Sequence, residues 1–200
     1  LLLFPALAHA ERLRIIHIPG YLAVEPHQVK EIYRRATPYF SKLNIGFRVK
    51  FWYAPENPCP ENHQLYTRVS QLYCLRALSP QRRRTITYWL TPPFVTVNKP
   101  VNEGGSQTAW IAGIAFVCGN ISTGNGIERQ LVDGVFGPSR IAASAVILAH
   151  EVFHNLCATH RDHKPNLMHP AANNFPADEL PVLRLTLREI KRAYAQGRRG

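Results

Sequence analysis

The chain has 200 residues and a net charge of +11 at pH 7, from 24 Lys and Arg against 13 Asp and Glu. Hydrophobic residues make up 46% and charged residues 18%, which excludes a disordered chain, and the length is that of one globular domain. The positive charge, carried mainly by arginine, favours acidic polypeptides or an anionic cell surface as partners. No helix-turn-helix pattern or basic module interleaved with aromatic residues accompanies it, so nucleic acid is not an expected partner.

The first ten residues resemble the end of a signal peptide. Residues 1–8 form an apolar run, and Ala8-His9-Ala10 fits a cleavage site flanked by small residues. The run is too short to span a bilayer, and the alternative is an N-terminal strand. We therefore expect a signal-peptide remnant at 1–10, one domain over 11–200 and a monomer without a transmembrane segment. Export to the periplasm or the cell exterior follows, where disulfides persist.

In the first half of the chain, the hydrophobic pattern predicts strands and one amphipathic helix. Pro26 fits the first position of a helix whose apolar residues recur at helical spacing, and Pro38 should kink or end that helix early. The strands are predicted at residues 12–18, 47–53 and 85–90.

The second half contains a longer apolar segment and two further helices. Residues 109–117 predict a strand, 122–126 a Gly-rich turn and 130–136 a further short strand. Ser139 is the expected N-cap of a helix that is apolar nearly all round and therefore buried. A capping box at Thr186 predicts a C-terminal helix to about residue 195.

Four cysteines suit two disulfides, and the sequence leaves three pairings open. We favour Cys59–Cys74, which closes a local loop, and Cys118–Cys157, which ties a strand to the end of the buried helix. Free buried thiols and a metal-ligand role for Cys157 are the alternatives for the second pair.

The buried helix carries the pattern H-E-x-x-H, formed by His150, Glu151 and His154. Residues four apart lie on one helix face, so the two imidazoles can reach one tetrahedral Zn²⁺. Glu151 stands beside this face, where it can take a proton from an attacking water. Because the pattern is short, two satisfied core histidines are the alternative.

A third histidine, His160, follows six residues after the second. This offset suits a ligand that arrives after the helix has ended, and three histidines with one open position describe a catalytic zinc site. His163 and His169 are more typical of surface or outer positions, and Asp162 would orient an imidazole. Glu179 is the nearest carboxylate that would serve instead of His160 as an acidic third ligand.

With His160 and Met168, this segment resembles the signature of the metzincin metallopeptidases, H-E-x-x-H-x-x-G-x-x-H followed by a Met-turn. The Met-turn is similar to that of the matrixin branch, whereas His-Asn-Leu at 154–156 is similar to the adamalysin branch. Cys157 stands where the family has Gly, and a side chain in that conformation costs about 1 kcal/mol.

The resemblance implies an α/β (α+β) fold: a twisted, mostly parallel sheet with an antiparallel edge strand, a long buried zinc-binding helix and a C-terminal helix. It implies one catalytic Zn²⁺ held by His150, His154 and His160, with Glu151 as general base and Met168 as a hydrophobic floor. Calcium is left open.

The resemblance also implies a substrate-binding edge strand made of Gly113, Ile114, Ala115 and Phe116, with Pro170 on the wall of a specificity pocket. An edge strand offers unpaired N–H and C=O groups to an extended peptide. A plain interior strand is the alternative for this segment.

The expected function is that of a secreted zinc-dependent endopeptidase acting on a polypeptide, with acidic polypeptides favoured by the charge. The alternatives are a zinc hydrolase of a non-peptide amide, which would lack an exposed edge strand, and a catalytically silent zinc-containing binding or toxin module. The silent module would have its site blocked by residues 54–80 or by the amino terminus.

Overall fold

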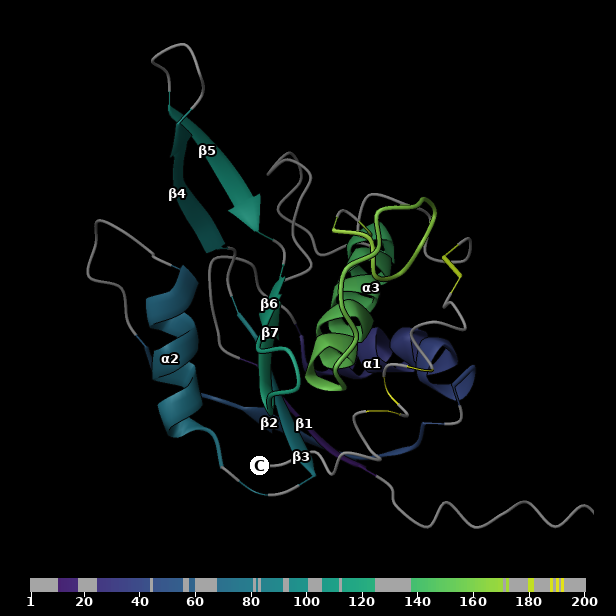
Figure 1. Ribbon diagram of the computed structural model, residues 1–200. Helices are drawn as coiled ribbons and strands as arrows, with labels where there is room; N and C mark the ends of the chain where they lie inside the picture. Colours follow the sequence, from purple (N-terminus) through teal and green to yellow (C-terminus); the bar gives the residue numbers. More distant parts are fainter. Residues whose placement is uncertain are drawn as a thin grey trace, which may run out of the picture.

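A computed structural model describes most of the chain from residue 11 onward. The described residues are 11–17, 25–43, 45–55, 58–59, 68–80, 82, 84–91, 94–100, 106–111, 113–124, 138–170, 172, 180–181, 188, 190 and 192. They form three layers, in which helices α1 and α3 cover one face of a central sheet and α2 covers part of the other (Figure 1). The signal-peptide remnant, the predicted strand at 130–136 and Glu179 lie outside these residues.

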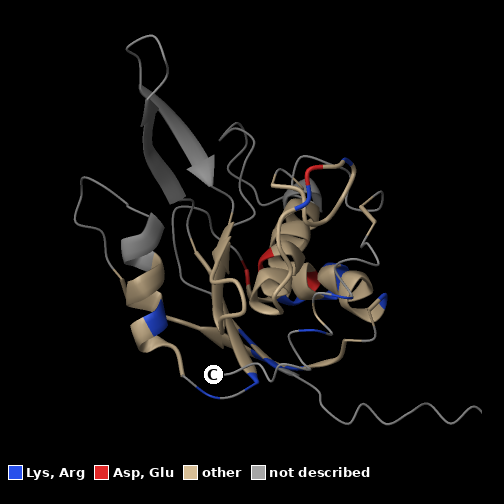
Figure 2. Cartoon of the chain, viewed as in Figure 1, with Lys and Arg blue, Asp and Glu red and all other residues tan. Residues whose placement is uncertain are grey.

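The central sheet has five strands in the order β2 (Phe47–Tyr53), β1 (Glu11–His17), β3 (Thr85–Leu90), β7 (Ile121–Gly124) and β6 (Gly113–Ala115). The first four are mutually parallel, and β6 runs antiparallel to β7 at the edge. The predicted mostly parallel sheet with an antiparallel edge strand is therefore confirmed. Lys and Arg residues along β1 and β2 are drawn blue in Figure 2.

Two predictions for residues 106–126 were wrong. The apolar segment 109–117 is divided between β5 (Ser106–Ile111), which pairs with β4 (Phe94–Pro100) in a separate two-stranded sheet, and β6. The expected turn at 122–126 instead begins inside strand β7, where Ser122 and Thr123 are fully buried. Their burial between β3 and β6 overrides the turn-like composition.

Helix α1 (Pro26–Ser41) begins at the predicted proline and runs three residues past Pro38. Pro38 did not end the helix early, because it lies in the last turn, where its carbonyl still accepts a hydrogen bond from Lys42. Helix α3 (Pro138–Asn155) begins one residue before the predicted N-cap, Ser139.

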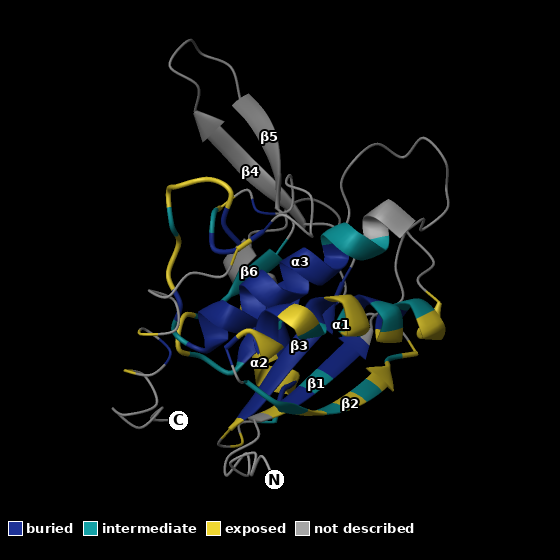
Figure 3. Ribbon diagram, turned by 90° about the vertical axis from the view of Figure 1, so that its right-hand side faces the viewer, coloured by how far each residue is buried: buried dark blue, intermediate teal, exposed yellow. Residues whose placement is uncertain are grey.

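Helices α1 and α3 share one large hydrophobic core with the sheet face beneath them. Residues 144–156 are all buried, and Figure 3 shows this part of α3 in dark blue next to α1. Phe153 of α3 packs edge-on against Phe40 of α1, with 5.5 Å between ring centroids. Fully burying a side chain of this size contributes about 1.5–3 kcal/mol, so α3 is held rigidly in the middle of the molecule.

On the opposite face, helix α2 (Arg68–Leu78) packs over a smaller core around Trp89 and Ile121. The disulfide Cys59–Cys74 ties α2 to the loop before it. Of the predicted C-terminal helix, only residues 188, 190 and 192 are described, and they are helical. Among the described residues, no helix combines the length and apolar composition needed to span a membrane.

Candidate metal centre

The H-E-x-x-H pattern lies in the last two turns of α3. His150 and His154 project from one face of the helix, and each side chain is buried. Their ring centroids are 4.7 Å apart and their Nε2 atoms 3.0 Å apart. The helical spacing thus brings the two imidazoles together as predicted.

Backbone carbonyls of the segment after α3 fix both rings. His150 donates Nδ1–H to the Leu167 carbonyl at 2.6 Å, and His154 donates Nδ1–H to the Ala158 carbonyl at 2.7 Å. Since each Nδ1 carries the proton, each Nε2 presents its lone pair. This is the tautomer that a metal-ligating histidine needs.

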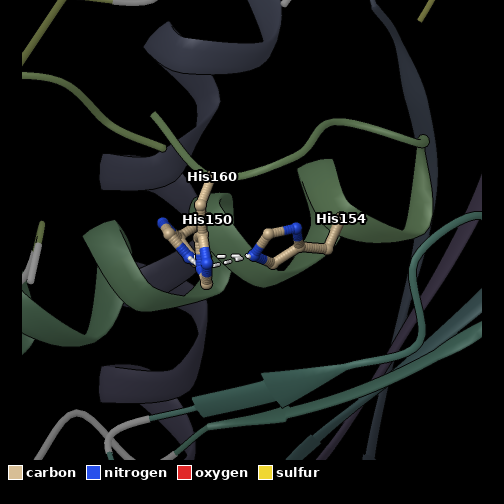
Figure 4. A group of neighbouring side chains, drawn as sticks. All are labelled: His150, His154 and His160. Atoms are coloured by element: carbon tan, nitrogen blue, oxygen red, sulfur yellow. Dashed lines mark hydrogen bonds between the residues drawn. The ribbon is translucent and has the colours of Figure 1, made fainter. Parts of the chain in front are cut away.

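His160 comes from the loop after α3 and completes a group of three (Figure 4). The chain leaves the helix through Cys157, whose φ of 74° is in the left-handed region, and turns back over the helix end. The Nε2 atom of His160 lies 3.1 Å from that of His154 and 3.3 Å from that of His150. The loop thus adds its imidazole where the two helical rings already meet.

The geometry of these three nitrogens fits one zinc ion. Ligand atoms of a tetrahedral site at about 2.0–2.1 Å from the ion are about 3.3 Å from one another. The observed Nε2 separations are 3.0, 3.1 and 3.3 Å. Lone pairs that face one another at such distances repel unless a cation lies between them, so the donor set matches a metal site.

The charge state of the rings also fits a metal site. The pKa of His150 is lowered to about 3, mainly by burial. Burial is also the main cause that lowers the pKa of His154 and of His160. The three imidazoles are therefore neutral at pH 7, as metal ligation requires.

Glu151 lies on the side of α3 that faces the edge strand β6, and its side chain is buried. Burial raises the pKa of its carboxyl group well above the usual value. A Cβ added to Gly113 of β6 would lie only 2.6 Å from Oε1 of Glu151. Because Gly113 has no side chain, the Glu151 carboxyl group can occupy the space next to it. A larger residue at position 113 would displace this carboxyl group.

Three hydrogen bonds and a disulfide hold the turn after β6 against the end of α3. Asn155 donates Nδ2–H bonds to the carbonyls of Phe116 at 3.0 Å and Ile121 at 2.8 Å. The Cys118 amide donates to the His154 carbonyl at 2.9 Å, and Cys118 is bonded to Cys157. The edge strand is thereby fixed relative to the histidines. One end of the disulfide, Cys157, is the residue that replaces the Gly of the metzincin signature.

The remaining predicted residues lie in different environments. Met168 is buried in the main core, next to Leu167, whose carbonyl holds His150. Pro170 is exposed. Ile114 and Phe116 pack toward the α2 core, so only Gly113 and Ala115 face the α3 side.

The groups that orient the imidazoles were not identified from the sequence. Backbone carbonyls orient His150 and His154. Asp162 is exposed and its charge acts on His160, so its role in orienting an imidazole stays a prediction for that third ring. A backbone carbonyl has no signature in the sequence. The amide of Asn155 was detectable only as a polar residue in an apolar helix.

No protein-family model matches the sequence, and no curated protein sequence matches it. Solved structures nevertheless align over most of the chain. The archaemetzincin of Methanopyrus kandleri has a TM-score of 0.60 at 13% identity, over 93% of this chain and 96% of that chain. A zinc-dependent peptidase of Methanocorpusculum labreanum has a TM-score of 0.59 at 12% identity, over 89% of this chain and 99% of that chain.

Metalloproteinase-II of Bacteroides fragilis has a TM-score of 0.53 at 12% identity, over 92% of this chain and 52% of that chain. At these identities the likeness concerns the fold alone. The chain therefore has the same fold as an archaemetzincin, with a three-histidine centre at the end of its buried helix.

Proposed function

We propose that the protein is a zinc-dependent endopeptidase. The observation that carries the proposal is the convergence of three neutral imidazoles beside a buried glutamate, in a fold that archaemetzincin and zinc-dependent peptidase structures share. Neutral imidazole nitrogens favour zinc among the common metals, whereas calcium prefers oxygen ligands. We therefore assign Zn²⁺ to this centre and do not assign calcium.

In this proposal, His150, His154 and His160 would hold the metal through Nε2. The bound zinc would supply Lewis acidity that polarises the scissile carbonyl and activates a water. Glu151 accepts the proton of the attacking water and later delivers it to the leaving amine. Its raised pKa suits a group that must hold that proton between the two steps. Met168, which is buried in the main core, would form a hydrophobic floor under the metal and do no chemistry.

The substrate would be bound along β6. Phe116 donates its N–H to the Ile121 carbonyl, so the alternation of an antiparallel pair directs the N–H and C=O of Ala115 away from β7. A peptide in extended conformation can pair with these groups and pass Glu151 at Gly113. Because such pairing uses main-chain groups on both sides of the scissile bond, it favours internal cleavage of a polypeptide. Pro170 is proposed as part of the wall that receives a substrate side chain.

We further propose that residues 11–200 form one catalytic domain that acts as a monomer outside the cytoplasm, after loss of residues 1–10. The two disulfides are compatible with an oxidising compartment. N-terminal sequencing of the exported protein tests the removal of residues 1–10. We expect the exported chain to begin at Glu11.

A peptide-library cleavage assay tests the proposed function. The zinc-loaded protein is expected to cleave internal bonds, a chelator to abolish cleavage, and added Zn²⁺ to restore it. A protein that binds zinc but leaves every peptide intact while hydrolysing small amides would be a non-peptide amidase. A protein that binds zinc and hydrolyses neither would be a silent zinc-containing module.

A further inference from the structure

The sheet face on the side of α2 carries a cluster of positive charges that the proposed peptidase chemistry does not use. Residues of β1 and β2 alternate, so Leu13, Ile15 and their neighbours enter the main core while the intervening residues face the other side. These intervening residues are Arg12 and Arg14 on β1 and Arg48 and Lys50 on β2.

The register places these cations side by side. Arg12 is paired with Arg48 and Arg14 with Lys50, at a strand spacing of about 4.8 Å. Arg82 adds a further charge from the segment before β3. The pKa of Arg14 is lowered mainly by burial and also by the charge of Arg82. We name these five residues, Arg12, Arg14, Arg48, Lys50 and Arg82, the basic face. Like charges opposite each other destabilise a sheet, so this arrangement costs stability.

Edge protection explains only part of the basic face. Cations on an edge strand prevent pairing with other chains, which accounts for Arg48 and Lys50 on β2. It does not account for Arg12 and Arg14, because β1 lies between β2 and β3 inside the sheet. A partner of opposite charge would explain the whole cluster.

Of the acidic residues whose side chains the structure describes, none lies on this face. Glu25 and Glu31 belong to the start and the body of α1, and α1 packs on the opposite side of the sheet. Glu151 lies on α3 and Asp162 in the loop after it. In Figure 2, blue segments run along β1 and β2 while red segments lie on the helices and the loop beyond α3.

An exposed tryptophan borders the basic face. Trp52 follows Lys50 on the same side of β2 and is 50% exposed. The guanidinium of Arg14 lies 5.2 Å from the centre of the Trp52 ring. Trp and Tyr next to cations are typical of surfaces that bind at a membrane interface, where the rings sit at the level of the headgroups.

We propose that the basic face, with Trp52 at its border, docks the protein on anionic lipid headgroups. Four of the five cations lie on a sheet surface that α2 leaves uncovered, since α2 packs over Ile16, Trp89 and Ile121. The three histidines lie on the α3 side of the sheet, so docking leaves them accessible.

Vesicle co-sedimentation of the full chain tests this proposal. The wild type is expected to bind vesicles of phosphatidylcholine with phosphatidylglycerol, to bind neutral phosphatidylcholine vesicles far less, and to be released by salt. Since one cation near an anionic surface contributes about fivefold in affinity, Arg48→Gln with Lys50→Gln is expected to weaken binding about 30-fold. Arg12→Gln with Arg82→Gln should weaken it equally.

The matched control is Arg34→Gln with Arg35→Gln, which removes the same net charge from exposed positions on α1. It should change vesicle binding less than twofold. Equal losses in all three double variants would mean that only net charge matters, and absence of binding to anionic vesicles would equally overturn the proposal. Binding to single-stranded DNA through the same residues, without binding to vesicles, would assign the basic face to nucleic acid instead. None of these outcomes depends on peptidase activity.

Discussion

Glu151→Gln is expected to retain zinc and to lose proteolysis. The amide has the same shape as the acid and suits a buried site, but it cannot accept the proton of the attacking water. Loss of a general acid–base group costs about 10²–10⁴-fold in rate. The measurement is kcat/KM on a cleaved library peptide, together with zinc content by atomic absorption.

The control for this experiment is Glu31→Gln, which changes a partly exposed glutamate on α1 and should leave kcat/KM unchanged. Undiminished cleavage by Glu151→Gln at full zinc content would refute the general-base role. Loss of zinc together with activity would instead mean that Glu151 supports the metal centre, and the proposed division of roles would be wrong.

His160→Ala is expected to abolish tight zinc binding with little effect on folding. His160 is exposed at the start of the loop after α3, so its removal leaves the core intact. Loss of a group that only supports a ligand already costs about 10–100-fold in metal affinity, and loss of a direct ligand costs more. Competition with a chromophoric chelator measures the affinity, and circular dichroism checks the fold.

His163→Ala is the matched control, since His163 is an exposed histidine three residues along the same loop. It should bind zinc as the wild type does. If the two variants bind zinc equally, His160 is not a ligand, and the site would reduce to the two helical histidines.

The parts of the molecule predicted well from the sequence are those set by local periodicity. Residues 47–53 and 85–90 alternate, the segment 12–18 is apolar and extended, and the helical spacing of His150 and His154 places both rings on one face of the helix. His160 required more than periodicity, because its approach depends on a left-handed turn at Cys157. The six-residue spacing from His154 indicated that the chain turns back after the helix, but it did not predict how the imidazole of His160 is oriented.

The features missed from the sequence depend on tertiary contacts. Strand β7 is short and contains Ser122 and Thr123, so its composition indicated a turn until β3 and β6 were placed on either side of it. The basic face could also not be predicted from the sequence, because Arg12 and Arg48 lie far apart along the chain. Only the parallel register of β1 and β2 makes them neighbours.

Zinc K-edge X-ray absorption on the purified protein is the most direct test of the account, which depends on three imidazoles sharing one ion. We expect one zinc per chain and three imidazole nitrogens at about 2.0–2.1 Å, in a spectrum dominated by nitrogen and oxygen scatterers. A protein that takes up no zinc, or a spectrum dominated by sulfur at about 2.3 Å, would contradict it.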